Sequence, residues 1–198
     1  MSDEVADPSR RAWVGIACGA GAVGGLAAAV PFVASFAPSE RAKAAGAAVE
    51  VDISTLKPGE MATVEWRGKP VWILKRTPEQ LESLKATEPK VADPQSKRNP
   101  ELTPEYARNQ YRSIKPDVLV AVGICSHLGC SPTAKLQAGA QPSLPDDWAG
   151  GFFCPCHGSM FDLAGRVYKN VPAPDNLEVP PHTFLTDTTL LIGEDKKA

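Results

Sequence analysis

Cysteine and histidine, residue types that bind transition metals readily, are concentrated in two short segments of this 198-residue sequence. Residues 125–130 have the sequence CSHLGC and residues 154–159 have the sequence CPCHGS. Each segment follows an apolar run that predicts a strand, so a rigid element would fix the start of each loop. Glycine and proline let the loops curl until their side chains converge on one point. We therefore expect the two loops to bind a metal or a cluster together.

The order of the ligand types separates the candidate metals. Two cysteines and two histidines suit tetrahedral zinc, but zinc fingers usually pair cysteine with cysteine and histidine with histidine. Here each loop would supply one cysteine and one histidine, and zinc would leave a second cysteine in each loop unexplained. A [2Fe–2S] cluster in which two histidines replace two cysteines on one iron, as in Rieske centres, accounts for the order better. The predicted ligands are Cys125, His127, Cys154 and His157. A structural zinc module is the alternative.

The two remaining loop cysteines, Cys130 and Cys156, each lie close in sequence to a predicted ligand. A disulfide between them would clamp the two loops over the cluster. Because such a bridge persists only in an oxidising compartment, the pattern predicts a head that is exported from the cytoplasm.

Both loops resemble the signature boxes of the Rieske iron–sulfur proteins, with Ser126 where the family usually has threonine. The extra cysteine in each box resembles the high-potential branch that is found in cytochrome bc complexes. Residues 171–179, VPAPDNLEV, are similar to the proline loop of that branch, with Pro172, Ala173 and Pro174 at its centre. Together with an apolar N-terminal segment and a polar insertion before the first box, these features resemble the bacterial iron–sulfur subunit of ubiquinol–cytochrome c reductase over essentially the whole chain.

The resemblance implies a role for each residue of the boxes. Cys125 and Cys154 would bind the inner iron, and His127 and His157 would bind the outer, exposed iron. His157 matches the ligand whose free ring nitrogen bonds the quinol and takes its proton. Leu128 matches the apolar residue at the tip that docks on a partner.

Two further residues would tune the cluster. Ser159 matches a serine whose hydroxyl bonds a cluster sulfide and raises the potential. Phe161 stands where the family often has a tyrosine whose hydroxyl bonds a cysteine sulfur. Because that hydroxyl is absent here, we expect a lower midpoint potential than in relatives that have the tyrosine.

The N-terminal part is long and apolar enough to cross a membrane. Residues 13–36 contain no charged side chain, and about 20 apolar residues span the core of a bilayer as a helix. Arg10 and Arg11 favour a cytoplasmic location for residues 1–12 and also resemble a twin-arginine export signal. Residues 37–49 predict a tether, which serves either as a passive spacer or as a hinge. A cleaved signal peptide is the alternative to a retained anchor.

Residues 50–198 predict a periplasmic head that is mostly β. Runs at 63–66 and 71–74 predict a hairpin, residues 118–124 a buried strand, and residues 177–179 one of several shorter strands. The resemblance adds their arrangement, an antiparallel β-sandwich with a small cluster-binding subdomain and a helix–loop insertion.

The polar insertion between the hairpin and the buried strand is expected to contain helices. Thr77 and Pro78 are typical of a helix start, as cap and first-turn residue. A second short helix is expected at 104–111. Elsewhere in the head, the tryptophans are expected in the core, and His182, which follows two prolines, in a solvated loop.

By resemblance, the chain accepts an electron from ubiquinol at the cytochrome b site, gives the proton to His157, and passes the electron to a membrane-anchored cytochrome c. The complex is expected to be dimeric and to lie in the bacterial inner membrane with the head in the periplasm. The alternative is a Rieske subunit of another periplasmic oxidoreductase, such as the small subunit of an arsenite oxidase. The net charge of -2 gives no reason to expect a nucleic acid partner.

Overall fold

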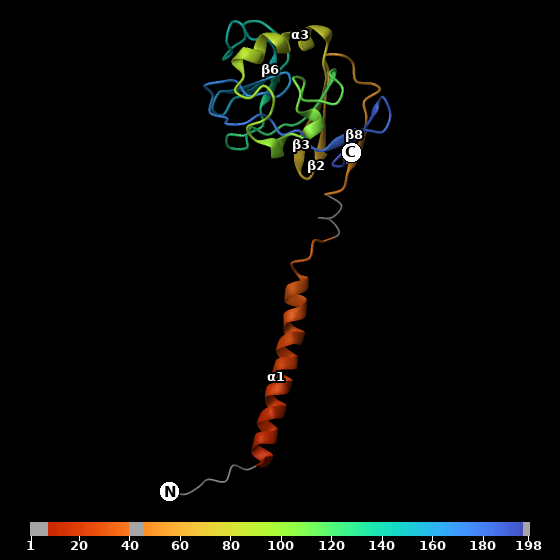
Figure 1. Ribbon diagram of the computed structural model, residues 1–198, viewed down its shortest axis with the longest axis vertical. Helices are drawn as coiled ribbons and strands as arrows, with labels where there is room; N and C mark the ends of the chain where they lie inside the picture. The colour runs from red at the N-terminus through yellow and green to blue at the C-terminus, as the bar shows by residue number, and fades with distance from the viewer. Residues whose placement is uncertain (1–7, 40–45, 196–198) are drawn as a thin grey trace. The chain divides into compact units, whose positions relative to one another are not determined.

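A computed structural model of the chain describes residues 8–39 and 46–195. The chain forms two compact units, Met1–Ala44 and Ala45–Ala198. Among the described residues, the first unit holds one helix and the second holds every strand (Figure 1). Residues 40–45, which belong to the predicted tether, lie outside the described part of the chain.

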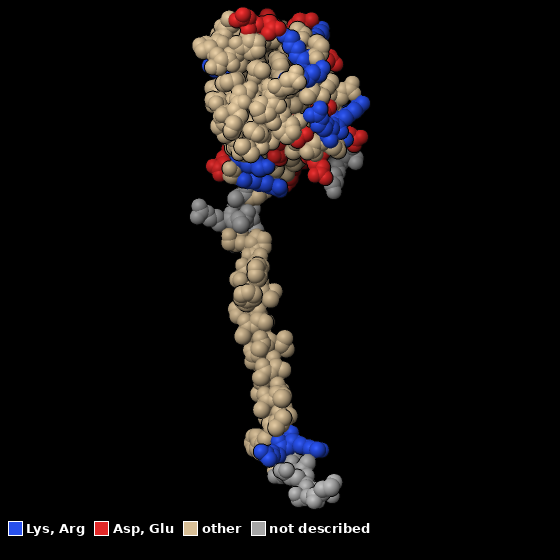
Figure 2. Space-filling view, turned by 90° about the vertical axis from the view of Figure 1, so that its left-hand side faces the viewer, with Lys and Arg blue, Asp and Glu red and all other residues tan. Residues whose placement is uncertain are grey.

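The N-terminal unit is built from helix α1 (Pro8–Ala34), which is 27 residues long. At 1.5 Å per residue it extends for about 40 Å, more than the hydrocarbon core of roughly 30 Å that a membrane helix must cross. Its arginines lie at its N-terminal end, and the rest of its surface carries no charged side chain (Figure 2). By length and composition Ser9–Ala34 is a candidate membrane span. N-terminal signal sequences meet the same length and composition criteria.

The described part of the head, residues 46–195, contains three antiparallel sheets of three strands each. Their strand orders are β1 (Val49–Asp52), β9 (Thr189–Ile192), β8 (His182–Phe184); β2 (Met61–Trp66), β3 (Lys69–Lys75), β4 (Val118–Val122); and β5 (Thr133–Lys135), β6 (Gly151–Cys154), β7 (Ser159–Asp162). The prediction of a mostly β, antiparallel head is confirmed.

Strands β3 and β4 are buried on both faces because their alternate side chains enter two different cores. On one face Val71, Ile73 and the valines of β4 pack against β9, which makes a sandwich of the first two sheets. On the other face Trp72 and Leu119 pack with the sheet β5-β6-β7. The two-sided burial explains why residues 118–124 form an unbroken apolar run. As predicted, the tryptophans of the head are buried: Trp66, Trp72 and Trp148.

The predicted hairpin is confirmed and is longer than expected, with β2 and β3 joined by Arg67 and Gly68. Both turn residues have positive φ, 52° and 71°, which suits the twist of a two-residue hairpin turn. At the end of β4, a Cβ on Gly123 would lie 2.3 Å from the ring of Trp72. Glycine therefore lets the chain pass this ring on its way into the first loop.

The insertion begins with α3 (Pro78–Thr87), where Thr77 and Gln80 form a capping box, so the predicted helix start is confirmed. Three short 3-10 turns follow: η1 (Glu88–Lys90), η2 (Pro100–Leu102) and η3 (Glu105–Ala107). The predicted helix at 104–111 is wrong, because only η3 forms there. The side chain of Asn109 accepts from the backbone N–H of Tyr111 at 2.9 Å, a local bond that competes with helix formation.

Two predictions for the C-terminal part are also wrong. His182 is 1% exposed, and its Nδ1 lies 2.8 Å from the carbonyl oxygen of Pro180 while its ring packs edge-on against Tyr106. The chain buries this ring because β8 begins at His182, directly after the prolines. Residues 177–179 form no strand, since their backbone bonds go to different elements; the N–H of Val179, for example, donates to Leu102.

Candidate metal centre

The two predicted loops have the same backbone closure. In the first, Gly129 N donates to Cys125 O at 3.1 Å, and in the second Gly158 N donates to Cys154 O at 2.9 Å. Both glycines have positive φ, 82° and 77°, which favours glycine at the fifth position of each loop. The first cysteine of each loop therefore lies close to a rigid element: Cys154 is the last residue of β6, and Cys125 follows the end of β4 by three residues.

The two predicted histidine ligands are brought together from different positions in these loops. His127 is the third residue of its loop and His157 is the fourth of the other, yet their ring centroids are 4.7 Å apart. His157 is exposed and His127 is half-buried. Leu128, which occupies the fourth position of the first loop, is 70% exposed. The histidines and this leucine therefore lie at the outer side of the loop pair.

The two predicted cysteine ligands lie on the inner side. Cys125 and Cys154 are each 2% exposed and take no part in a disulfide. Burial raises the pKa of the Cys125 thiol, and contact with the Cys154 thiol raises it further, whereas the hydroxyl of Ser159 acts in the opposite direction. A buried thiolate is favoured when a cation lies beside it. Two inner thiols and two outer imidazoles are thus a donor set that fits a cluster with one sulfur-bound and one nitrogen-bound iron.

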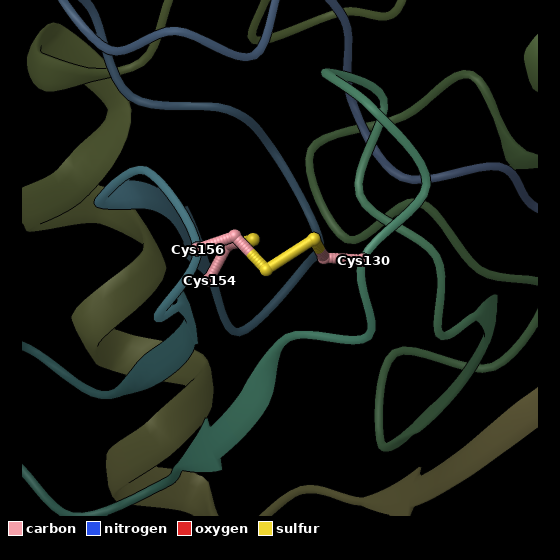
Figure 3. A group of neighbouring side chains, drawn as sticks. All are labelled: Cys130, Cys154 and Cys156. Atoms are coloured by element: carbon pink, nitrogen blue, oxygen red, sulfur yellow. A yellow bond between two sulfur atoms is a disulfide. The ribbon is translucent and has the colours of Figure 1, made fainter.

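The remaining loop cysteines form a disulfide, as predicted. Cys130 and Cys156 are joined, with their Cα atoms 6.7 Å apart, and the bond links the two loops covalently (Figure 3). The sulfur of Cys154 lies beside this bridge, within 4.8 Å of both of its sulfurs. These three sulfurs do not make a separate metal site, because two of them are already bonded to each other.

The predicted proline loop is fastened to both cluster loops by serine hydroxyls. Ser126 donates to the carbonyl oxygen of Asp175 at 2.6 Å, and Ser159 accepts from the N–H of Ala173 at 3.0 Å. Ala173 is buried, whereas Pro172 and Pro174 are exposed. Since Ser159 accepts from the backbone, its own proton is available for a sulfur acceptor.

Sequence reasoning missed other residues that hold the proline loop. Arg98 donates to the carbonyl oxygen of Pro174 at 2.8 Å. Asn176 accepts from the N–H of Val167 at 2.8 Å and donates to Ser96 at 3.1 Å. No local sequence pattern predicts these contacts, because the partners are far apart in sequence.

Phe161 packs as an ordinary core residue. It is fully buried in β7, directly opposite Phe152 of β6, and Phe152 in turn stacks on Trp72 with ring centroids 4.8 Å apart. Phe161, Phe152 and Trp72 therefore connect the sheet β5-β6-β7, which carries the second loop, to the sheet β2-β3-β4. The effect of the missing hydroxyl on the potential stays a prediction.

Comparison with known proteins agrees with this geometry. The sequence model of the Rieske [2Fe-2S] domain family matches residues 103–181, which include both loops and the proline loop. The cofactor is therefore a [2Fe–2S] cluster.

Two curated relatives match along nearly their whole length, and both are named ubiquinol-cytochrome c reductase iron-sulfur subunit. The protein of Allochromatium vinosum is 57% identical over 94% of this chain and 89% of the relative. That of Bradyrhizobium diazoefficiens is 42% identical over 94% of this chain and 95% of the relative. A solved structure titled "Hyperthermophilic respiratory Complex III" is 30% identical over 89% of this chain and 98% of that one, with a TM-score of 0.45. The chain belongs to the family of ubiquinol–cytochrome c reductase iron–sulfur subunits.

Proposed function

We propose that this chain is the electron-transfer subunit of a ubiquinol–cytochrome c reductase, with its cluster held by Cys125, His127, Cys154 and His157. The observation that carries the proposal is the difference in burial within the loop pair, in which Cys125 and Cys154 are buried and His157 is exposed. An exposed imidazole beside a buried redox centre is the group that a quinol can reach.

The chain's own residues then have distinct tasks. When bound, the cluster supplies one-electron redox chemistry. His157 accepts a hydrogen bond from the quinol hydroxyl at its free ring nitrogen and takes the proton as the electron leaves. Leu128, 70% exposed at the adjacent tip, supplies an apolar contact with cytochrome b. The proline loop covers the buried side and excludes water.

The proposed partners and location are supported by the family and by the N-terminal helix. Cytochrome b would hold the quinol, and a membrane-anchored cytochrome c would take the electron, in a dimeric complex. α1 would anchor the chain in the bacterial inner membrane, with the arginines at its start on the cytoplasmic side. The disulfide between Cys130 and Cys156 supports a periplasmic head, because it requires an oxidising compartment.

A redox titration followed by EPR tests the proposal on membranes that contain the intact chain. We expect a reduced [2Fe–2S] signal that changes when a quinol-site inhibitor is added, and a midpoint potential that falls as the pH rises into the alkaline range. A potential that does not depend on pH would contradict proton transfer to a ligand histidine. Zinc in place of iron, with no such signal, would contradict the cofactor. Co-purification with haem proteins tests the partners separately.

A further inference from the structure

Three fully buried arginines surround the turn that follows β7. Arg76, Arg112 and Arg166 are at most 2% exposed, and the only fully buried carboxylate among the described residues is that of Asp162. Arg166 Nε donates to Asp162 Oδ2 at 2.7 Å, and Arg76 Nη1 donates to the carbonyl oxygen of Leu163 at 3.1 Å. This buried group therefore contains two more cationic than anionic side chains.

Arg112, like Arg76, is bonded only to uncharged partners, and it makes the larger number of these bonds. Its Nε, Nη1 and Nη2 atoms donate at 2.6–3.1 Å to Ser96 Oγ, Ala164 O, Gly165 O, Thr103 Oγ1 and Leu177 O. Burial lowers the pKa of Arg112 to about 10, which still leaves the guanidinium protonated at neutral pH. The side chain thus places a full positive charge in the interior, with no carboxylate bonded to it.

The charge is connected to the cluster loops through the proline loop. Arg112 bonds the carbonyl oxygen of Leu177, and Ser96 accepts from both Arg112 and Asn176. Asn176 follows Asp175, whose backbone is bonded to Ser126 in the first cluster loop. Along β7, Asp162 is three residues from Ser159, about 10 Å in a strand, so the turn that the arginines surround lies about that far from the second cluster loop, in a poorly screened interior.

We propose that Arg112 raises the midpoint potential of the [2Fe–2S] cluster through its buried positive charge, to which no carboxylate is bonded. One-electron reduction adds one negative charge at the cluster, and a nearby positive charge in a poorly screened interior favours that state. Asp162 acts in the opposite direction. The inference rests on the proposed ligation of the cluster by the two loops.

Charge and hydrogen bonding can be separated by four variants of the full-length chain. We expect Arg112→Gln to lower the midpoint potential, Arg112→Lys to keep it close to that of the parent chain, and Asp162→Asn to raise it. Ser96→Ala is the matched control, since it removes an oxygen that Arg112 bonds without changing any charge. We expect a much smaller shift for Ser96→Ala than for Arg112→Gln.

The measurement is an EPR-monitored redox titration in membranes at one fixed pH. A normal cluster signal with an unchanged potential in Arg112→Gln would overturn the inference, and so would an equal downward shift in Ser96→Ala. If Arg112→Gln does not assemble a cluster, the sign of the shift in Asp162→Asn decides: an upward shift supports the inference and a downward or absent shift overturns it. Absence of any [2Fe–2S] signal in the parent chain would instead contradict the proposed function.

Discussion

The imidazole rings of His127 and His157 lie 4.7 Å apart between centroids and stand nearly perpendicular, at 87°. They come from separate loops and from different positions within them, so the pairing of the loops alone brings them together. Leu128 occupies in the first loop the place that His157 occupies in the second. Two imidazoles at this separation can serve one metal ion, and each should then be essential to the site.

Replacement of His157 by asparagine should abolish the cluster, because it removes one of the two proposed outer nitrogen ligands. The visible absorption spectrum and the iron content of the purified full-length chain measure the loss. Leu128→Ala is the matched control, since it changes the corresponding loop position and should leave the iron content unchanged. A full complement of iron in His157→Asn would show that this histidine is not a ligand.

Removal of the disulfide should make the cluster more labile without preventing its formation. Cys130 and Cys156 are separated by 26 residues, and closing a loop of that length stabilises a fold by roughly 3–4 kcal/mol in the chain-entropy account. The double variant Cys130→Ala/Cys156→Ala should therefore lose its visible absorbance at a lower temperature. Cys18→Ala, which removes a free cysteine in α1, is the control and should behave as the parent chain. Loss of visible absorbance at the same temperature in the double variant, in Cys18→Ala and in the parent chain would show that the disulfide does not stabilise the cluster.

Local sequence signals predicted much of the fold and of the site. The hairpin of β2 and β3, the capping box at Thr77 and the buried strand β4 each depend on neighbouring residues, whose periodicity and turn chemistry are visible in the sequence. The cysteines and histidines of the two loops could be recognised in the sequence because each loop fixes the spacing between them. The structure adds the difference in burial between His157, which is exposed, and Cys125 and Cys154, which are buried; the spacing does not contain this difference.

What the sequence could not show depends on contacts between distant segments. Ser126 and Asp175 are bonded across 49 positions, and Arg112 bonds Leu177 across 65. Such contacts have no periodicity, and a polar side chain has the same local pattern whether it faces water or the interior. The burial of Arg112 and His182 follows from strand pairing and loop packing that only the folded chain reveals.

Replacement of Ser126 by alanine should loosen the proline loop. The hydroxyl donates to Asp175 O and accepts from the backbone N–H of Asp175, with 3.3 Å between N and Oγ. Loss of such bonds costs about 1 kcal/mol each. We expect faster bleaching of the cluster by a chelator in Ser126→Ala. Ser126→Thr, which keeps the hydroxyl, should bleach at the rate of the parent chain. If the alanine variant bleaches no faster than the threonine variant, the hydroxyl does not hold the loop.

Introduction of a hydroxyl at Phe161 should raise the midpoint potential, because a hydrogen bond to a cysteine sulfur stabilises the more negative, reduced state. The test is a redox titration of Phe161→Tyr at constant pH. Phe153→Tyr is the control, since Phe153 is the neighbour of Phe152 in β6 and its side chain points to the opposite face of the sheet. No change, or a decrease, in Phe161→Tyr would contradict the tuning role of the missing hydroxyl.

The buried ring of His182 should make the stability of the head fall as the pH falls. Burial lowers the pKa of His182 below its ordinary value of 6.5, while the carbonyl of Pro180 opposes the shift only in part. Below that pH the unfolded chain takes up a proton that the folded chain refuses, so the free energy of unfolding decreases, by at most about 1.4 kcal/mol per pH unit for one proton. Above that pH the ring is neutral in both states and the effect vanishes.

Chemical denaturation of the full-length chain in detergent between pH 8 and pH 5 measures this dependence. His182→Asn keeps an amide that can donate to Pro180 but cannot take up a proton, so its stability should change less across the window from about 6.5 downward. Carboxylates contribute equally to the parent chain and to the variant, and the difference between the two slopes therefore isolates the histidine. Parallel slopes would mean that the ring takes up its proton as readily in the folded head as in the unfolded chain. That would require β8 to open and expose the ring.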